Sequence, residues 1–139
     1  MTFLEAKDEL SDFLALRKEI MLIENLEEDL HNQSLKSPKL DSVGFSKFVT
    51  SNDQLVQKTD KLNRLDEQLQ KLKNEEKIYL KRLQAVSSKH STVLAAIYYL
   101  GYKLSKVSEI SHYSKSEMSR RLSKSVQAYA DAFDRPLKY

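Results

Sequence analysis

The stretch Leu104–Val126, LSKVSEISHYSKSEMSRRLSKSV, decides the fold of this chain, because it holds two helical patterns with a helix start between them. Apolar residues three or four positions apart share one face of a helix. On this spacing Val107 and Ile110 mark one short helix, and Met118, Leu122 and Tyr129 mark a second. The stretch therefore predicts two helices joined by a tight turn.

The second helix is predicted to begin at Ser114. A serine hydroxyl can accept a hydrogen bond from one of the unpaired backbone N–H groups in the first turn of a helix. Glu117 follows three residues later, which is the spacing of a capping box. His112 and Tyr113 then lie in the turn.

The outer face of this second helix is cationic and rich in hydroxyl groups. At about 100° per residue, that face holds Ser116, Ser119, Arg120, Ser123, Lys124 and Gln127. A helix-turn-helix places such a helix in the major groove of DNA, where arginine contacts guanine and lysine neutralises phosphates. The alternative is a helical hairpin whose basic face is merely solvated.

On the first interpretation the partner is double-stranded DNA. The residues expected to face it are Lys115, Ser116, Ser119, Arg120, Ser123 and Lys124, with Lys106 and Arg121 on flanking phosphates.

Composition favours a helical protein of one domain, or of one small domain with an extension. The 139 residues include only two glycines and two prolines, and no cysteine, which excludes disulfides and thiolate metal sites. The N-terminus lacks the pattern of a signal peptide, and no apolar run has the length of a membrane span. We therefore expect an all-α cytoplasmic protein with no membrane contact.

Charge is distributed unevenly along the chain. Residues 1–33 carry three basic and nine acidic side chains, residues 34–84 carry eleven and seven, and residues 85–139 carry nine and four. The C-terminal part is therefore the part expected to meet a polyanion.

Two long helices are predicted before the helix-turn-helix. Residues 1–33 form an acidic amphipathic helix, because apolar residues recur at helical spacing from Phe3 to Leu30. Residues 34–51 contain Pro38 and Gly44 and are predicted to be a mobile connection. Residues 52–86 form a coiled-coil-like helix.

The heptad seam of that helix is the most regular pattern in the chain. Its positions are Leu55, Leu62, Leu65, Leu69, Leu72, Tyr79, Leu83 and Val86. The seam predicts contacts in a homodimer or higher oligomer, and the alternative is a hairpin with the first long helix of the same chain.

A third helix follows a predicted break at residues 87–91 and ends at Gly101, which is suited to a helix C-terminus. With the two helices of the opening stretch it completes a helix-turn-helix domain at residues 87–133. The tail, residues 134–139, is expected to fray.

The C-terminal half resembles a known family. It carries Val-Leu at 93–94, Tyr-Tyr-Leu-Gly-Tyr at 98–102, Val-Ser-Glu-Ile at 107–110 and Tyr-Ser-Lys-Ser-Glu-Met-Ser-Arg-Arg-Leu at 113–122. This order resembles the sigma-factor region-4-like helix-turn-helix of small phage regulators, the ArpU- and RinA-like late-operon activators of Gram-positive hosts. The family pattern has tryptophan where this sequence has Val107, alanine where it has Ser111, and arginine where it has Tyr98. The resemblance covers about residues 52–130.

The resemblance implies a sequence-specific transcriptional regulator encoded by a phage or mobile element, with RNA polymerase as a further candidate partner. Two other functions remain open: a DNA-packaging oligomer like a phage small terminase subunit, and a coiled-coil protein-interaction module. No motif points to an enzyme or a cofactor. His31, His90 and His112 lack the paired spacing of metal ligands.

Overall fold

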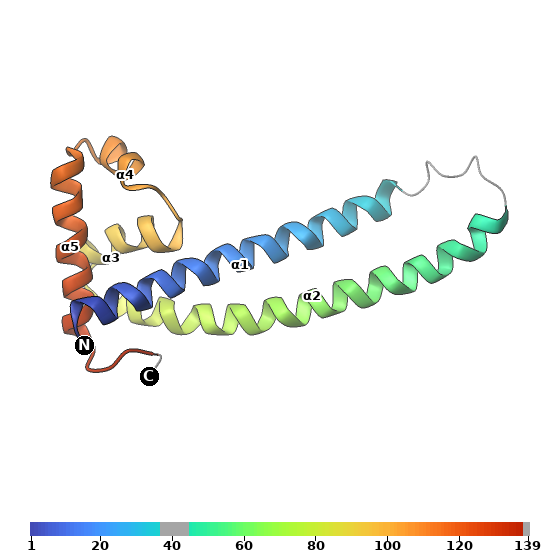
Figure 1. Ribbon diagram of the computed structural model, residues 1–139, viewed down its shortest axis with the longest axis horizontal. Helices are drawn as coiled ribbons and strands as arrows, with labels where there is room; N and C mark the ends of the chain where they lie inside the picture. The colour runs from blue at the N-terminus through green and yellow to red at the C-terminus, as the bar shows by residue number, and fades with distance from the viewer. Residues whose placement is uncertain (37–44, 138–139) are drawn as a thin grey trace. The chain divides into compact units, whose positions relative to one another are not determined.

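A computed structural model describes residues 1–36 and 45–137, with side chains for residues 1–32 and 55–137. These residues form helices joined by short connections (Figure 1). The helices are α1 (Phe3–Lys36), α2 (Phe45–Ala85), α3 (Ser88–Leu94), the π-helical turn η2 (Ala95–Tyr99), α4 (Leu104–Ser111) and α5 (Lys115–Ala132). The predicted all-α fold, with two long helices before shorter ones, is confirmed.

The chain forms two compact units. Unit 1 contains Met1–Lys18 and Glu75–Tyr139, and unit 2 contains Glu19–Asn74. The predicted helix-turn-helix domain at residues 87–133 is therefore only part of unit 1, which also includes the start of α1 and the end of α2. Within the part of the chain that the structure describes, no helix combines the length and the apolar content that crossing a membrane requires.

The connection predicted at residues 34–51 is shorter than expected. Residues 34–36 continue α1 and residues 45–51 begin α2, so the prediction was wrong at both of its ends. The serines and threonine of these segments do not prevent helix formation, because only glycine and proline carry a large helix penalty. The expected mobility of residues 37–44 lies outside the described residues.

In unit 2, α1 and α2 lie side by side and bury their apolar stripes within one chain (Figure 1). Ile20, Ile23 and Leu69 are buried. Of the other seam residues in this unit, Leu62, Leu65 and Leu72 are half-buried and Leu55 is exposed. The hairpin alternative therefore accounts for most of the seam.

In unit 1 the same two helices form an aromatic and ionic core. The ring of Phe13 stacks on that of Tyr79 with the centroids 5.0 Å apart. Arg17 Nη1 lies 2.7 Å from a carboxylate oxygen of Glu76. Leu83 and Val86 are buried as well. Glu76, which occupies the heptad position between Leu69 and Leu83, is thus paired with an arginine from α1.

The break before α3 is limited to Val86 and Ser87, because residues 88–91, which were predicted to be part of the break, are helical. At its C-terminal end, α3 continues into the wider π-helical turn η2, and the helix stops at Gly101. The φ of Gly101 is +74°, the left-handed conformation that glycine adopts readily. The N–H of Tyr102 donates to the carbonyl of Ala96 at 3.0 Å, which is one residue further back than in a Schellman motif and follows the wider π-helical turn. The predicted helix end at Gly101 is confirmed.

The C-terminal tail is tied to the helices rather than frayed. Arg82 Nη2 donates to the carbonyl of Arg135 at 2.9 Å, and the N–H of Leu137 donates to Glu9 Oε1 at 2.5 Å. The prediction of a frayed tail was therefore wrong for residues 134–137. That prediction did not anticipate that Arg82 of α2 and Glu9 of α1 form hydrogen bonds with the tail. Residues 138–139 lie outside the described residues.

Candidate nucleic-acid interface

A three-residue connection joins α4 to α5, as the sequence predicts. His112 ends α4 in the left-handed conformation, with φ 63° and ψ 21°. Ser114 is extended, and its Oγ accepts a hydrogen bond from the N–H of Glu117 at 3.2 Å. The chain therefore reverses at His112, and the serine cap starts α5 at the predicted residue.

The buried face of α4 differs from the predicted one. Val107 and Ser108 are buried, Leu104 and Ser111 are half-buried, and Ile110 is 60% exposed. The inward positions are thus spaced by three and four residues from Leu104, and Ile110 lies beyond their edge. Ser108 and Ser111 occupy this face because their hydroxyls donate to backbone carbonyls of the same helix, at 2.9 Å and 2.6 Å. The pairing of Ile110 with Val107 in one apolar face was wrong.

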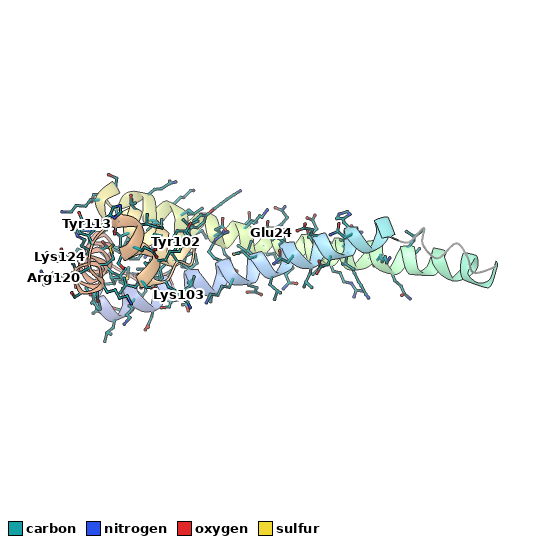
Figure 2. All side chains as sticks on the ribbon, turned by 90° about the horizontal axis from the view of Figure 1, so that it is seen from above. Glu24, Tyr102, Lys103, Tyr113, Arg120 and Lys124 are labelled. Atoms are coloured by element: carbon teal, nitrogen blue, oxygen red, sulfur yellow. The ribbon has the colours of Figure 1, made fainter. Side chains whose placement is uncertain are left out.

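The two faces of α5 are separated as the sequence predicts. Its buried side chains are Met118, Ser125, Val126, Tyr129 and Ala130. Its exposed side chains include Lys115, Ser116, Ser119, Arg120, Ser123, Lys124 and Gln127. Arg120 and Lys124 project from the outer side of the helix (Figure 2). All six residues expected to face DNA are therefore exposed. Five of them, Ser116, Ser119, Arg120, Ser123 and Lys124, lie away from the buried side and form what we call the α5 outer face, and Lys115 is the first residue of the helix.

Glu117 sits between two arginines at the start of this surface. Its carboxylate oxygens lie 3.4 Å from Arg120 Nη1 and 3.3 Å from Arg121 Nε. The guanidinium of Arg121 also lies 4.0 Å from the ring centroid of Tyr113. Arg121 Nε is buried and its contact with Glu117 lacks the geometry of a hydrogen bond. Arg121 is thus held against Tyr113 and Glu117 with its side chain 37% exposed, whereas that of Arg120 is 67% exposed.

Lys106 adds a cation from α4. Its Nζ lies 4.2 Å from the ring centroid of Tyr102, an arrangement in which the aromatic face attracts the ammonium group. Tyr102 and Lys103 come just before α4 and are labelled in Figure 2. Lys106 remains exposed and is therefore accessible to a phosphate beside the α5 outer face.

Contacts that sequence reasoning missed fix the inner side of α5. The hydroxyl of Tyr129 donates to the carboxylate of Glu9, and His90 Nδ1 lies 3.1 Å from Ser125 Oγ. Because Ser125 Oγ already donates to the carbonyl of Arg121, it accepts from His90. The one local sign of the Glu9 contact was a carboxylate within the apolar stripe formed by Ala6, Leu10 and Phe13.

Burial changes the acidity of the tyrosines in unit 1. It raises the pKa of Tyr129 above the ordinary range, and the hydrogen bond to Glu9 raises it further. Burial also raises the pKa of Tyr98 and of Tyr79, for which the charges of Asp12 and Glu9 add to the effect. The neutral phenol is therefore the form that this core accommodates.

The histidines do not come together. His31 is exposed in unit 2, and His112 is exposed in the turn of unit 1. His90 is half-buried against α5 through Ser125. Of the three, only His112 is next to the start of α5.

Comparison of the chain with models of protein families, with curated proteins and with solved structures gave no match. The resemblance to sigma-factor region-4-like regulators therefore stays a prediction from the residues.

Proposed function

We propose that this protein is a sequence-specific regulator of transcription that binds double-stranded DNA through α5. The observation that carries the proposal is the α5 outer face, where Arg120 and Lys124 are exposed among serines on the helix that follows the turn, with Lys115 exposed at the start of that helix. A short helix, a tight turn and a capped helix with such a surface form the arrangement that helix-turn-helix proteins place in a major groove.

Within this surface the cations have different roles. Arg120 is suited to a bidentate contact with a guanine edge, because its guanidinium is exposed and on the helix's outer side. Its contact with Glu117 is a solvent-exposed ion pair, which is weak enough to be exchanged for a base. Lys115 and Lys124 would neutralise phosphates, and the serines would contact bases or phosphates.

The neighbouring cations would fix the orientation of α5 on the duplex. Lys106, beside the ring of Tyr102, would contact a flanking phosphate. Arg121 was expected in the same role. Since it is held between Glu117 and Tyr113, we propose that it instead orders the turn and the first turn of α5.

The experiment that tests the proposal is selection from a library of random duplex DNA with the full chain at physiological salt, followed by sequencing. An enriched motif would support a specific regulator, and an inverted repeat would further indicate a two-fold complex. Binding without enrichment that disappears as salt rises would contradict specificity and favour the packaging alternative. The absence of DNA affinity at low salt would contradict DNA binding altogether and favour a protein-interaction module.

A regulator of this kind would act in the bacterial cytoplasm, where the DNA is. The resemblance to late-operon activators adds RNA polymerase as a candidate partner. Co-purification of polymerase with the protein on a DNA fragment containing the selected motif would support that part of the proposal, and its absence from such complexes would contradict it.

A further inference from the structure

Unit 2 contains an open groove with a volume of about 410 Å³ between α1 and α2. Leu26 and Leu30 from α1 and Leu65 from α2 supply its apolar lining. Leu26 is 43% exposed, and Leu22, one helical turn earlier on the same side, is 58% exposed. The hairpin thus leaves a second apolar stripe beside the one that it buries.

The two walls of the groove carry opposite charges. Asp29 lines it from α1, and Lys61 and Arg64 line it from α2. Within the described residues none of these three side chains belongs to an ion pair. The groove therefore has an acidic wall and a basic wall, each accessible to an external partner.

We propose that this groove is the interface of a homodimer, in which it binds the same groove of a second copy. The two-fold axis would run parallel to the helices. Rotation about such an axis places α1 of one copy against α2 of the other at the same level, so that Asp29 meets Lys61 and Arg64 of the second copy, twice by symmetry. An axis across the helices would instead place Asp29 against Asp29, which charge repulsion disfavours.

The resulting interface is a four-helix bundle. Leu22, Leu26 and Leu65 of each copy would lie in the apolar centre, and the charged walls would form its rim. This surface shares half-buried Leu65 with the heptad seam, whereas Leu69 of the seam is buried in each chain's own hairpin. The second copy is the occupant that complements both walls at once, because it supplies a basic wall for Asp29 and an acidic residue for Lys61 and Arg64.

The parallel axis also determines where the rest of each chain leaves the bundle. Both helices leave unit 2 at one end, at Glu19 in α1 and at Asn74 in α2. The two copies of unit 1 would therefore be attached at the same end of the dimer. The interface does not depend on DNA binding, so it can fail while the proposed function holds, and the reverse is also true.

The first test measures the mass of the full chain by sedimentation equilibrium over a range of concentrations. We expect a dimer with twice the 16.1 kDa of one chain. Leu26→Lys should weaken dimerisation at least about tenfold, because a lysine ammonium would lie in the apolar centre. Met21→Lys is the matched control, because Met21 is 52% exposed and lies about 140° around α1 from Leu26. It should leave the dimer intact.

The second test uses exposed charges, which do not carry the hairpin core. Asp29→Lys alone and the double variant Lys61→Glu/Arg64→Glu alone should each be monomeric, because like charges would face each other in both symmetric contacts. Mixed in equal amounts, the two proteins should form a heterodimer in which both contacts are attractive. Circular dichroism should show unchanged helicity in each.

Several results would overturn the proposal. A monomeric mass for the unmodified chain at the highest concentration would exclude the dimer, and a mass of many subunits would exclude a closed two-fold interface. Equal weakening by Leu26→Lys and Met21→Lys would place the interface elsewhere. Two helical charge variants that stay monomeric when mixed would contradict the pairing of Asp29 with Lys61 and Arg64.

Discussion

The carboxylate of Glu9 accepts a hydrogen bond from the hydroxyl of Tyr129, which joins the first long helix to the candidate recognition helix across 120 positions of sequence. Arg82 Nη1 lies 3.2 Å and 3.1 Å from the two oxygens of the same carboxylate. The N–H of Leu137 donates to it as well. Four segments of unit 1, namely α1, α2, α5 and the tail, therefore meet at one buried anion.

Removal of that anion should destabilise unit 1 strongly. Glu9→Ala leaves Arg82 and the Tyr129 hydroxyl without their acceptor, and breaking a buried pair in this way lowers the free energy of unfolding by about 3 kcal/mol. Tyr129→Phe should lower it by only about 1 kcal/mol, because Arg82 keeps its partner. Urea unfolding measures both. Asp8→Ala, an exposed acidic neighbour in α1, is the control, and an effect equal to that of Glu9→Ala would contradict the role of the buried contact.

The buried phenols should make the protein unstable in alkali. Because the pKa values of Tyr79, Tyr98 and Tyr129 are raised in the folded state, the unfolded chain loses these protons first as pH rises above about 10. Stability is therefore retained below that pH and lost above it. Absorbance of tyrosinate should show that these three of the seven tyrosines ionise late, together with unfolding. In Tyr129→Phe the loss of stability with pH should be shallower, and an unchanged slope would argue against this cause.

The helices were predictable because their signals are local. The apolar period of α1 and the heptads of α2 each extend over several turns, so that a single polar residue at an apolar position does not hide them. The cap at Ser114 was equally accessible, since it depends on a spacing of three residues. The serine-rich ends of α1 and α2 were missed because their composition resembles that of a loop.

The contacts between distant segments could not be read in this way. The seam of α2 is compatible with a second chain or with α1, because both arrangements bury the same side chains. At Glu9 the sequence indicated only that a carboxylate lies in an apolar stripe, and it did not identify the residues that this carboxylate contacts. Arg121 lies beside Tyr113 and Glu117 because of the way α4 and α5 pack. The periodicity of the sequence does not predict that packing.

Substitution of Gly101 should destabilise the protein because of the backbone conformation at this position, not because of steric crowding. A Cβ at this position would meet only Leu14 Cδ1, at an ordinary contact distance of 3.7 Å. Its φ of +74° disfavours any residue with a Cβ, so Gly101→Ala should lower the free energy of unfolding by about 1 kcal/mol. Gly101→Asn should lower it less, since asparagine tolerates the left-handed region. Equal losses in thermal or urea unfolding would point to crowding instead.

The cap of α5 should contribute measurably to stability. Ser114→Ala removes the acceptor of the Glu117 N–H and should lower the free energy of unfolding by about 1 kcal/mol. Ser114→Asp should preserve the cap, because a carboxylate accepts the same hydrogen bond and is favoured at a helix N-terminus. Ser119→Ala, an exposed serine within α5, is the matched control. If it is as destabilising as Ser114→Ala, the loss does not come from the cap.

Arg120 and Lys124 should affect DNA binding in different ways although both are exposed on α5. Arg120→Ala should reduce discrimination between the selected motif and random DNA by about 1–3 kcal/mol, because a base contact is lost. Lys124→Ala should weaken binding to all sequences alike and reduce the slope of affinity against salt by about 1, because a phosphate contact is lost. Fluorescence anisotropy at several salt concentrations measures both effects. Lys77→Ala, which removes the same charge from α2 in unit 1, should change neither. Equal losses on motif and random DNA in both α5 variants would contradict the assignment of Arg120 to a base and leave α5 with phosphate contacts only.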